Sequence, residues 1–232
     1  MILRWETHTH TAEGSACGKA SAADMARACR AAGYDGMIVT DHFFCGNTAV
    51  DRSLPWEEWV RQFAMGYRNA MAEGEKIGLR VAFGWEYSWE GNDFLTYGLS
   101  PEWLSAHPET TTLPPKEYLA LIRDSGGCIV HAHPFRQEWY VEAIRLLPEL
   151  VDAVEVWNAG NRLEAFNERA LWYAQSFGLL ETAGSDAHWE SAFRGGILTE
   201  RDLHSTEDYA ACVREGGICG LIVDGCDRRF PE

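Results

Sequence analysis

The chain has 232 residues, of which 46% are hydrophobic and 24% charged, as in an ordinary soluble globular domain. Its formal net charge of −15 disfavours long nucleic acids and membranes as partners, although bound metal ions can reverse the sign locally around a small phosphorylated substrate. No apolar run approaches the roughly 20 residues that span a bilayer. The seven cysteines include no CxxC pair, which indicates reduced thiols. We therefore expect a cytoplasmic protein with a single domain over residues 1–232.

Short β-like runs alternate with amphipathic helical stretches along the chain. In chain order, strands are expected at 1–6, 36–39, 79–86, 93–99, 128–131, 153–157, 179–183, 196–199 and 220–224. Helices are expected at 21–32, 55–77, 115–125, 139–147, 162–177 and 205–215. Loops are expected at 47–54 and 227–232, and a loop with at most one short turn at 101–114. The alternation favours a parallel sheet, and no glycine-rich phosphate loop follows any strand. We therefore expect an α/β barrel with a site at the C-terminal ends of its strands.

Four of these strands run directly into histidine. The residues concerned are His8 and His10, Asp41 and His42, His131 and His133, and Asp186 and His188. Residues two apart on a strand point to the same face, and the C-terminal ends of barrel strands lie on one side of the molecule. Converging imidazoles and carboxylates are the ligands that a cluster of divalent cations requires. The pattern predicts a metalloenzyme.

Three more residues have side chains that suit such a site. Glu86 ends the strand at 79–86 and is a candidate bridging carboxylate, with Glu90 as a nearby competitor. Arg136 follows His133 by three residues, and a guanidinium can bind phosphate bidentately. Asp41 could cap a helix or orient a neighbouring ligand.

Five ordered motifs resemble those of the PHP family, the polymerase and histidinol phosphatase superfamily. They are His8-Thr9-His10-Thr11, Thr40-Asp41-His42, Gly84-Trp85-Glu86, Ala132-His133-Pro134 and Gly184-Ser185-Asp186-Ala187-His188. The match extends from residue 1 to about residue 188. The resemblance implies a distorted seven-stranded (β/α)7 TIM-like barrel, which is the PHP fold. It also implies two or three divalent ions (Zn, Mn or Fe) and hydrolysis of phosphoesters.

The resemblance further implies a distribution of ligands. One ion would be held by His8, His10, Glu86 and Asp186, a second by Glu86 and His133, and a third by His42 and His188. Residues 13–18 differ from the family pattern, so Glu13 or Cys17 would replace a further ligand there, and Glu13 is favoured because it suits harder metals. Asn158 is a candidate for contact with metal or substrate, and His131 is expected behind the ligands.

The expected activity is hydrolysis of a small phosphomonoester, in which a metal-bound hydroxide attacks phosphorus and Arg136 neutralises charge on the phosphoryl oxygens. Either Asp41 or a site histidine would protonate the leaving oxygen. The alternatives are a phosphodiesterase or nucleotidase, an amidohydrolase, and a non-catalytic metal-binding PHP module. A non-catalytic module would have lost ligands that this chain keeps. The residues do not distinguish histidinol phosphatase, and they do not predict the substrate, the metals or the oligomeric state.

Overall fold

The computed structural model describes residues 1–231, which form a mixed α/β fold with two sheets. The strands are β1 (Leu3–Thr9), β2 (Gly36–Val39), β3 (Arg80–Phe83), β4 (Trp85–Trp89), β5 (Asn92–Tyr97), β6 (Cys128–Ala132), β7 (Ala153–Asn158), β8 (Leu180–Gly184), β9 (Gly196–Thr199), β10 (Ile218–Val223) and β11 (Cys226–Arg229). One sheet has the order β11-β10-β9-β1-β2-β3, and the other has the order β4-β5-β6-β7-β8.

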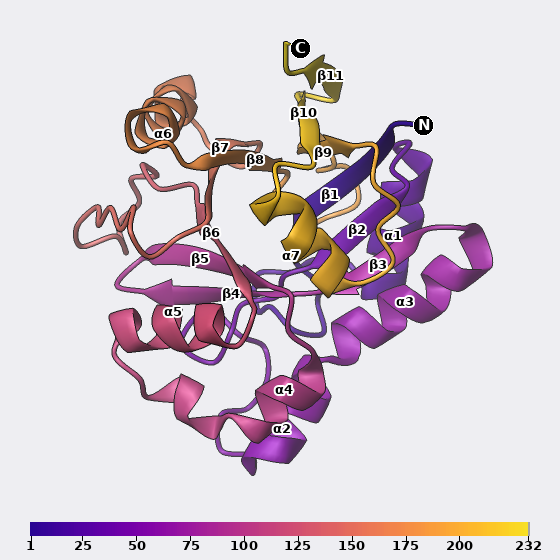
Figure 1. The fold of residues 1–232 in the computed structure, drawn as a ribbon. Coiled ribbons are helices and arrows are strands. Elements are labelled where there is room, and N and C mark those ends of the chain that lie inside the picture. Colours follow the sequence, from indigo (N-terminus) through magenta and orange to yellow (C-terminus); the bar gives the residue numbers. More distant parts are fainter. Residues whose placement is uncertain (232) are drawn as a thin grey trace.

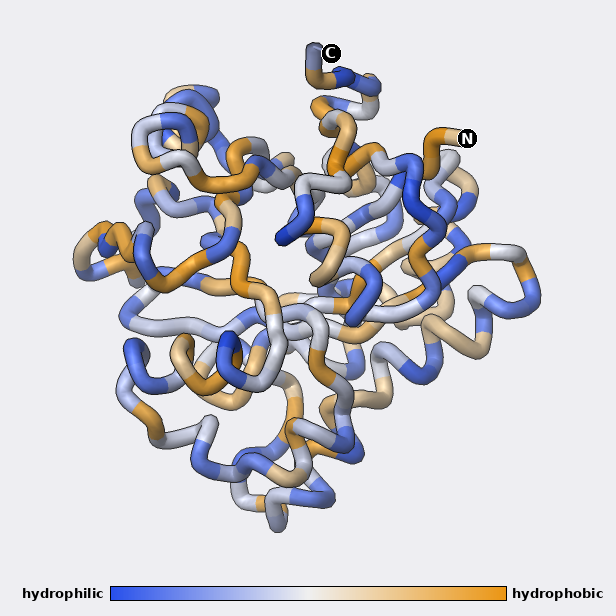
Figure 2. The backbone as a smooth tube through the Cα atoms, viewed as in Figure 1, coloured by the Kyte–Doolittle hydropathy of each residue, from blue (hydrophilic) through white to orange (hydrophobic). Residues whose placement is uncertain are grey.

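Helices cover the outer faces of both sheets (Figure 1). They are α1 (Ala22–Ala31), α2 (Trp56–Phe63), α3 (Met65–Ile77), α4 (Pro101–Ala106), α5 (Pro115–Asp124), α6 (Glu164–Phe177) and α7 (Thr206–Arg214), with a 3-10 turn at Pro108–Thr111. Helices α1 and α3 pack side by side next to β2 and β3, whereas α6 packs on β7 and β8. Hydrophobic and hydrophilic residues alternate along these peripheral helices (Figure 2), because one face of each is buried.

The expected seven-stranded closed barrel is not confirmed in residues 1–231. Strands β1, β2 and β3 are parallel, as are β6, β7 and β8, but β5 and β9 run antiparallel to their neighbours. The two sheets meet at two short parallel bridges, one between Thr9 and Ala187 and one between His42 and Glu86. Each has two hydrogen bonds: His10 N to Ala187 O (2.8 Å) with Ala187 N to His8 O (3.1 Å), and Phe43 N to Glu86 O (2.8 Å) with Glu86 N to Asp41 O (3.0 Å). These bonds join the C-terminal ends of the parallel strands, so the groups at those ends still converge.

Two of the expected long elements are each divided in two. The helix expected at 55–77 breaks at Ala64, between α2 and α3. A Cβ atom on Gly66 would lie 2.3 Å from Thr11 Oγ1 and 2.7 Å from Asp41 Oδ2, so the start of α3 packs directly against the strand ends. The strand expected at 79–86 breaks at Gly84, where the chain passes from one sheet to the other.

Three other expectations about local structure are wrong. Residues 139–147 contain no helix; the side chain of Asn92 instead bonds Ala143 O (2.9 Å) and Arg145 N (2.9 Å) and holds this segment irregular. Residues 101–114 contain α4, whose capping Ser100 and first-turn proline are the usual signals of a helix start. The tail expected at 227–232 contributes to β11, and only Glu232 lies outside the described residues.

The remaining strands and helices agree with the expected positions to within a few residues. The antiparallel pairing of β4 with β5 across Gly91 and Asn92 is confirmed, as are the capping residues Ser21 and Ser205. None of the helices in residues 1–231 combines the length and the apolarity that crossing a membrane requires.

Candidate metal centre

The carboxylate of Glu86 lies at the middle of a cluster of imidazoles. Its Oε1 is 3.3 Å from His8 Nε2 and 3.2 Å from His133 Nε2. Its Oε2 is 2.7 Å from His42 Nδ1 and 3.5 Å from His10 Nε2. Glu86 is 1% exposed, so its charge is removed from bulk water and depends on these neighbours. One carboxylate with both oxygens facing different imidazoles has the arrangement of a bridging ligand.

Asp186 forms the opposite wall of the cluster. Its Oδ1 lies 3.2 Å from His10 Nε2, 3.5 Å from His8 Nε2 and 3.5 Å from His188 Nδ1. Asp186 has a φ of 54° and His133 has a φ of 27°, so both follow their strands in left-handed backbone geometry. This geometry is uncommon outside glycine, and here it turns both side chains toward the cluster.

Two buried acidic residues, Glu155 and Asp41, orient His8 and His10 from behind. Glu155 Oε1 lies 3.0 Å from His8 Nδ1, and this pairing directs His8 Nε2 into the cluster. Ser15 Oγ lies 3.0 Å from His10 Nδ1 and donates to Asp41 Oδ1 at 2.7 Å. A carboxylate behind a histidine fixes its tautomer and raises its basicity, as is common at protein metal sites.

The charges of the cluster depend strongly on one another. Burial alone would raise the pKa of Glu86, but the imidazolium charges of His42 and His8 outweigh it and hold that pKa well below its usual range. Burial, reinforced by repulsion from His188 and His42, keeps the pKa of His10 well below its usual value. Glu86 is therefore an anion and His10 a neutral ligand at neutral pH, which are the forms that bind a cation.

His42 and His188 form the outer edge of the cluster, together with Cys17. Their side chains are 16% and 20% exposed, whereas those of His8 and His10 are fully buried. Burial would raise the pKa of the Cys17 thiol, but its interactions with the imidazoles of His188 and His42 lower it to about 6. Cys17 lines the same cavity as these two histidines.

Arg136 faces the same cavity from the loop after β6. Its Nη2 lies 2.7 Å from Asp186 Oδ2 and donates to Asn158 Oδ1 at 2.8 Å, while its Nε donates to Asn161 Oδ1 at 3.1 Å. Asn158 in turn donates to Glu155 Oε2 at 2.7 Å. Asn158 is thereby placed as the residue that holds Arg136, and its 1% exposed side chain does not line the cavity.

Two residues proposed from the sequence, Glu13 and Asp41, lie apart from the ligand cluster. Glu13 accepts from Ala22 N at 2.9 Å and Asn69 Nδ2 at 3.1 Å, at the start of α1, so the preference for Glu13 over Cys17 is not supported. Asp41 accepts from Thr11 and Ser15 and is 2% exposed, which suits positioning rather than proton transfer to a substrate. Burial raises the pKa of Asp41 to about 6 in spite of these hydrogen bonds.

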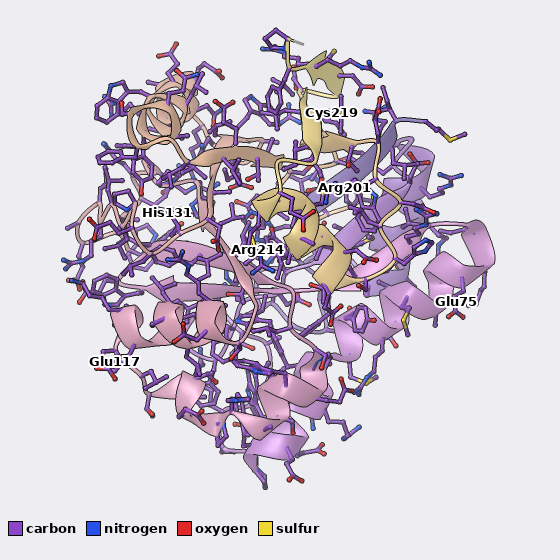
Figure 3. All side chains as sticks on the ribbon, viewed as in Figure 1. Glu75, Glu117, His131, Arg201, Arg214 and Cys219 are labelled. Carbon is purple, nitrogen blue, oxygen red and sulfur yellow. The ribbon has the colours of Figure 1, made fainter. Side chains whose placement is uncertain are left out.

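His131 and Glu90 also lie apart from the cluster. His131 is labelled in Figure 3. It packs between Phe94 on β5 and Tyr173 on α6, with ring centroids 4.7 Å and 5.8 Å away. Neither of its ring nitrogens has a hydrogen-bond partner among the described residues. Glu90 is in the turn before β5 and pairs with Arg145, so it does not compete with Glu86.

Sequence reasoning did not identify Asp93 as a site residue. Asp93 is 6% exposed, and its Oδ2 lies 3.9 Å from His133 Nε2. Glu86, Asp93 and His133 offer ligand atoms within 4.8 Å of one another. The expected antiparallel pairing of this strand could have identified Asp93. The start of an antiparallel strand lies beside the C-terminal ends of the parallel strands. Asp93 accordingly pairs with Ala132, the residue directly before His133.

The cluster opens into a cavity of about 630 Å³. Polar residues line its floor, and Trp139 and Tyr140 form part of its rim, with exposed fractions of 93% and 43%. A cavity of this size exceeds what a phosphate group fills, so it can accommodate a small organic ligand.

The donor set fits divalent cations. Glu86 Oε2 and His42 Nδ1 are buried atoms without a hydrogen bond, although they lie only 2.7 Å apart. Such a pair is costly unless a further group satisfies both atoms. Four groups of three ligand atoms lie within 4.8 Å of one another, drawn from His8, His10, His42, Glu86, Asp93, His133, Asp186 and His188. Mixed imidazole and carboxylate ligands suit Zn, Mn and Fe ions.

Comparison with known proteins agrees with a metal site on a mixed α/β fold. A family model described as PHP-associated matches residues 164–192, which include α6, β8, Asp186 and His188. No curated protein matches the chain. Similar solved structures supply the rest of the comparison.

A two-domain protein from Bacteroides vulgatus that contains a PHP-like metal-dependent phosphoesterase has a TM-score of 0.69 and 14% identity. The match covers 98% of this chain and 66% of that one, so this chain spans about two thirds of that protein. A candidate metal-dependent phosphoesterase from Bifidobacterium adolescentis has a TM-score of 0.54 and 20% identity over 90% and 96% of the two chains. An amidohydrolase from Chromobacterium violaceum, with bound sulfate, has a TM-score of 0.57 and 14% identity over 92% and 96%.

At these identities the structural similarity establishes the fold alone. The chain is thus similar in fold to proteins named as PHP-like metal-dependent phosphoesterases, and residues 164–192 match a PHP-associated family model. Both findings agree with the resemblance inferred from the five sequence motifs.

Proposed function

We propose that this protein is a metal-dependent phosphoesterase that hydrolyses a small phosphomonoester with two or three divalent ions. The observation that carries the proposal is the buried Glu86 carboxylate, whose two oxygens face four imidazoles and whose Oε2 has no hydrogen bond. When bound, the ions supply Lewis acidity and activate a water molecule for attack on phosphorus. The similar proteins named as metal-dependent phosphoesterases support this choice of chemistry.

The protein residues would bind and orient the substrate. Arg136 presents its guanidinium to the cavity and is held by Asp186, Asn158 and Asn161, so its position is fixed before a substrate enters. A fixed cation beside the phosphoryl oxygens stabilises the negative charge that builds on them in the transition state. The formal charge of the whole chain is −15, and Arg136 and the ions would make the cavity floor locally attractive to a phosphate.

We assign the metal ligands by their positions in the cluster. His8, His10, Glu86, Asp186 and His133 would form the buried floor of the centre, and His42 and His188 its outer edge. Asp93 would join Glu86 and His133, with which it shares a possible site. Glu155 and Asp41 would orient His8 and His10.

The test is removal and return of metal. The protein would be treated with a chelator, dialysed, and reconstituted separately with Zn²⁺, Mn²⁺ and Fe²⁺ before assay against phosphomonoesters, nucleotides, phosphodiesters and amides. We expect phosphomonoesterase activity to disappear with the metal and to return with at least one ion, and His10→Ala to remain inactive. Full activity after chelation would refute the proposal, whereas turnover of amides alone would favour the chemistry of the similar amidohydrolase.

A further inference from the structure

Strand β1 contains a β-bulge where it presents the first of the proposed ligands. Between Glu6 and Thr9 it has one residue more than the segment of β2 with which it pairs. The amides of Thr7 and His8, inside this bulge, both donate to Glu6 Oε1 at 2.9 Å. A bulge bends its strand and re-aims the side chains on it, and bulges are common beside active sites. The Glu6 carboxylate thus stabilises the irregular backbone that directs His8 into the centre.

The same carboxylate oxygen also binds the strand end that carries Asp186. Strand β1 pairs with β9 before the bulge and meets Ala187 only after it. Between these two contacts, the amide of Ser185 donates to Glu6 Oε1 at 2.9 Å. One oxygen therefore connects the backbone at His8 with the backbone next to Asp186, and the two ligand side chains lie 3.5 Å apart, from Nε2 to Oδ1.

Stability alone does not explain a carboxylate at this position. The side chain of Glu6 is fully buried, and its Oε2 has no hydrogen-bond partner in residues 1–231. Burying a carboxylate with one unpaired oxygen raises the free energy of the folded state. A residue that breaks this rule inside an otherwise well-packed domain is typical of a functional site.

We propose that Glu6 is a positioning residue of the metal centre, which holds the bulge at His8 and the backbone before Asp186 in the arrangement that lets both side chains bind one ion. This inference rests on the proposed metal-dependent function. Glu6 acts through the two ligands, because its side chain does not line the cavity and its Oε1 bonds backbone amides. Ligands that are ordered before the ion arrives bind it more tightly, since less conformational freedom is lost on binding.

Three variants test the assignment by metal affinity. The metal-free proteins would be titrated with Zn²⁺ in competition with a coloured chelator. We expect Glu6→Ala, which leaves the three amides without this acceptor, to bind about 10-fold to 100-fold more weakly. Glu6→Gln keeps a side-chain oxygen that can accept the same bonds, so it should restore most of the affinity.

Thr7→Val is the matched control in the same bulge. It removes the hydrogen bond from Thr7 Oγ1 to Ala183 O (2.7 Å) but leaves Glu6 and the amides bound to it in place. Urea unfolding of the metal-free proteins should show a loss of stability in both Thr7→Val and Glu6→Ala. Only Glu6→Ala should also lose affinity for Zn²⁺, which separates a positioning role from a structural one.

Amide hydrogen exchange tests the assignment on the natural sequence, so the result does not depend on how a variant folds. Coupling is reciprocal: if the bonds to Glu6 favour metal binding, metal binding favours those bonds by the same factor. We expect Zn²⁺ to slow exchange at the amides of His8 and Ser185 by about 10-fold to 100-fold. The amide of Arg4, which donates to Asp35 Oδ2 at 3.0 Å earlier on the same strand, should change little.

The assignment is overturned if Glu6→Ala binds Zn²⁺ as tightly as the natural protein, if Glu6→Gln loses as much affinity as Glu6→Ala, or if Zn²⁺ leaves exchange at His8 and Ser185 unchanged. The outcome is separable from that of the proposed function. Affinity that depends on Glu6 in a protein that hydrolyses no phosphoester would support the positioning role and refute the activity. Metal-dependent hydrolysis that is unchanged in Glu6→Ala would do the reverse.

Discussion

Strand β6 leads into two buried imidazoles with opposite surroundings. His133, just past its end, lies 3.2 Å from Glu86 and 3.9 Å from Asp93, both carboxylates. His131, on the strand, is fully buried between aromatic rings, and neither of its ring nitrogens has a partner in residues 1–231. Burial is therefore not what marks a metal ligand in this fold. Convergence with carboxylates from other strands is what distinguishes the centre from the apolar layer under α6.

We expect the largest loss of activity from Glu86→Gln, which removes the central carboxylate of the metal centre. The amide has nearly the same shape but carries no charge, so the four surrounding imidazoles lose their shared anion. We expect activity to fall by about 10³-fold or more, since several kcal/mol of charge stabilisation depend on the ions. Bound metal, measured by mass spectrometry of the dialysed protein, should fall in parallel. Glu90→Gln is the matched control and should retain metal. Equal losses of activity and bound metal in both variants would show that Glu86 is not a metal ligand.

Arg136→Lys separates substrate recognition from metal binding. Lysine keeps a positive charge near Asp186 but lacks the planar fork that Asn158 and Asn161 hold. We expect kcat/KM for a phosphomonoester to fall by about 10²-fold, as when one preorganised charge-stabilising donor is lost. Metal content should not change. An unaltered kcat/KM in Arg136→Lys would show that the guanidinium of Arg136 does not contribute to catalysis.

Glu155→Gln examines the support behind His8. Glutamine can still accept from His133 N, but it no longer places a full negative charge 3.0 Å from His8 Nδ1. Loss of such a carboxylate behind a ligand typically costs about 10-fold to 100-fold in metal affinity. Competition with a coloured chelator would measure it, with Glu168→Gln on the exposed face of α6 as the control. Unchanged affinity would mean that His8 is oriented by its backbone alone.

The sequence predicted the centre better than it predicted the architecture around it. Residues two apart at strand ends, such as His8 and His10, had to share a face, and the structure brings them together. The break at Gly84, by contrast, depends on contacts between sheets that no local pattern reveals. His131 shows the limit of the spacing argument, because the left-handed backbone at His133 turns the chain and separates the two side chains. Asp93 was missed because it lies at the start of its strand rather than at the end.

His131→Leu tests the apolar side of β6. The expected effect is the smallest of the four, and it is a gain in stability rather than a loss of function. Leucine fills a similar volume without leaving buried nitrogens unpaired, so we expect the free energy of unfolding at pH 7 to rise by about 1 kcal/mol. Burial and the charge of His133 lower the pKa of His131 from 6.5 to about 3. Between these values the unfolded chain binds a proton that the folded chain does not, so the natural protein loses stability as the pH falls below about 6.5.

The advantage of His131→Leu should therefore widen on acidification. Urea unfolding of the metal-free proteins at pH 7 and pH 5 would measure it, with His204→Asn on the exposed loop before α7 as a control that changes little. Metal affinity should be the same in His131→Leu as in the natural protein. If affinity fell instead, His131 would act behind the ligands as the sequence suggested, and the contrast between the two sides of β6 would fail. If stability fell, the ring nitrogens would be satisfied in solution, and aromatic packing on Phe94 and Tyr173 would be the reason this position holds an imidazole.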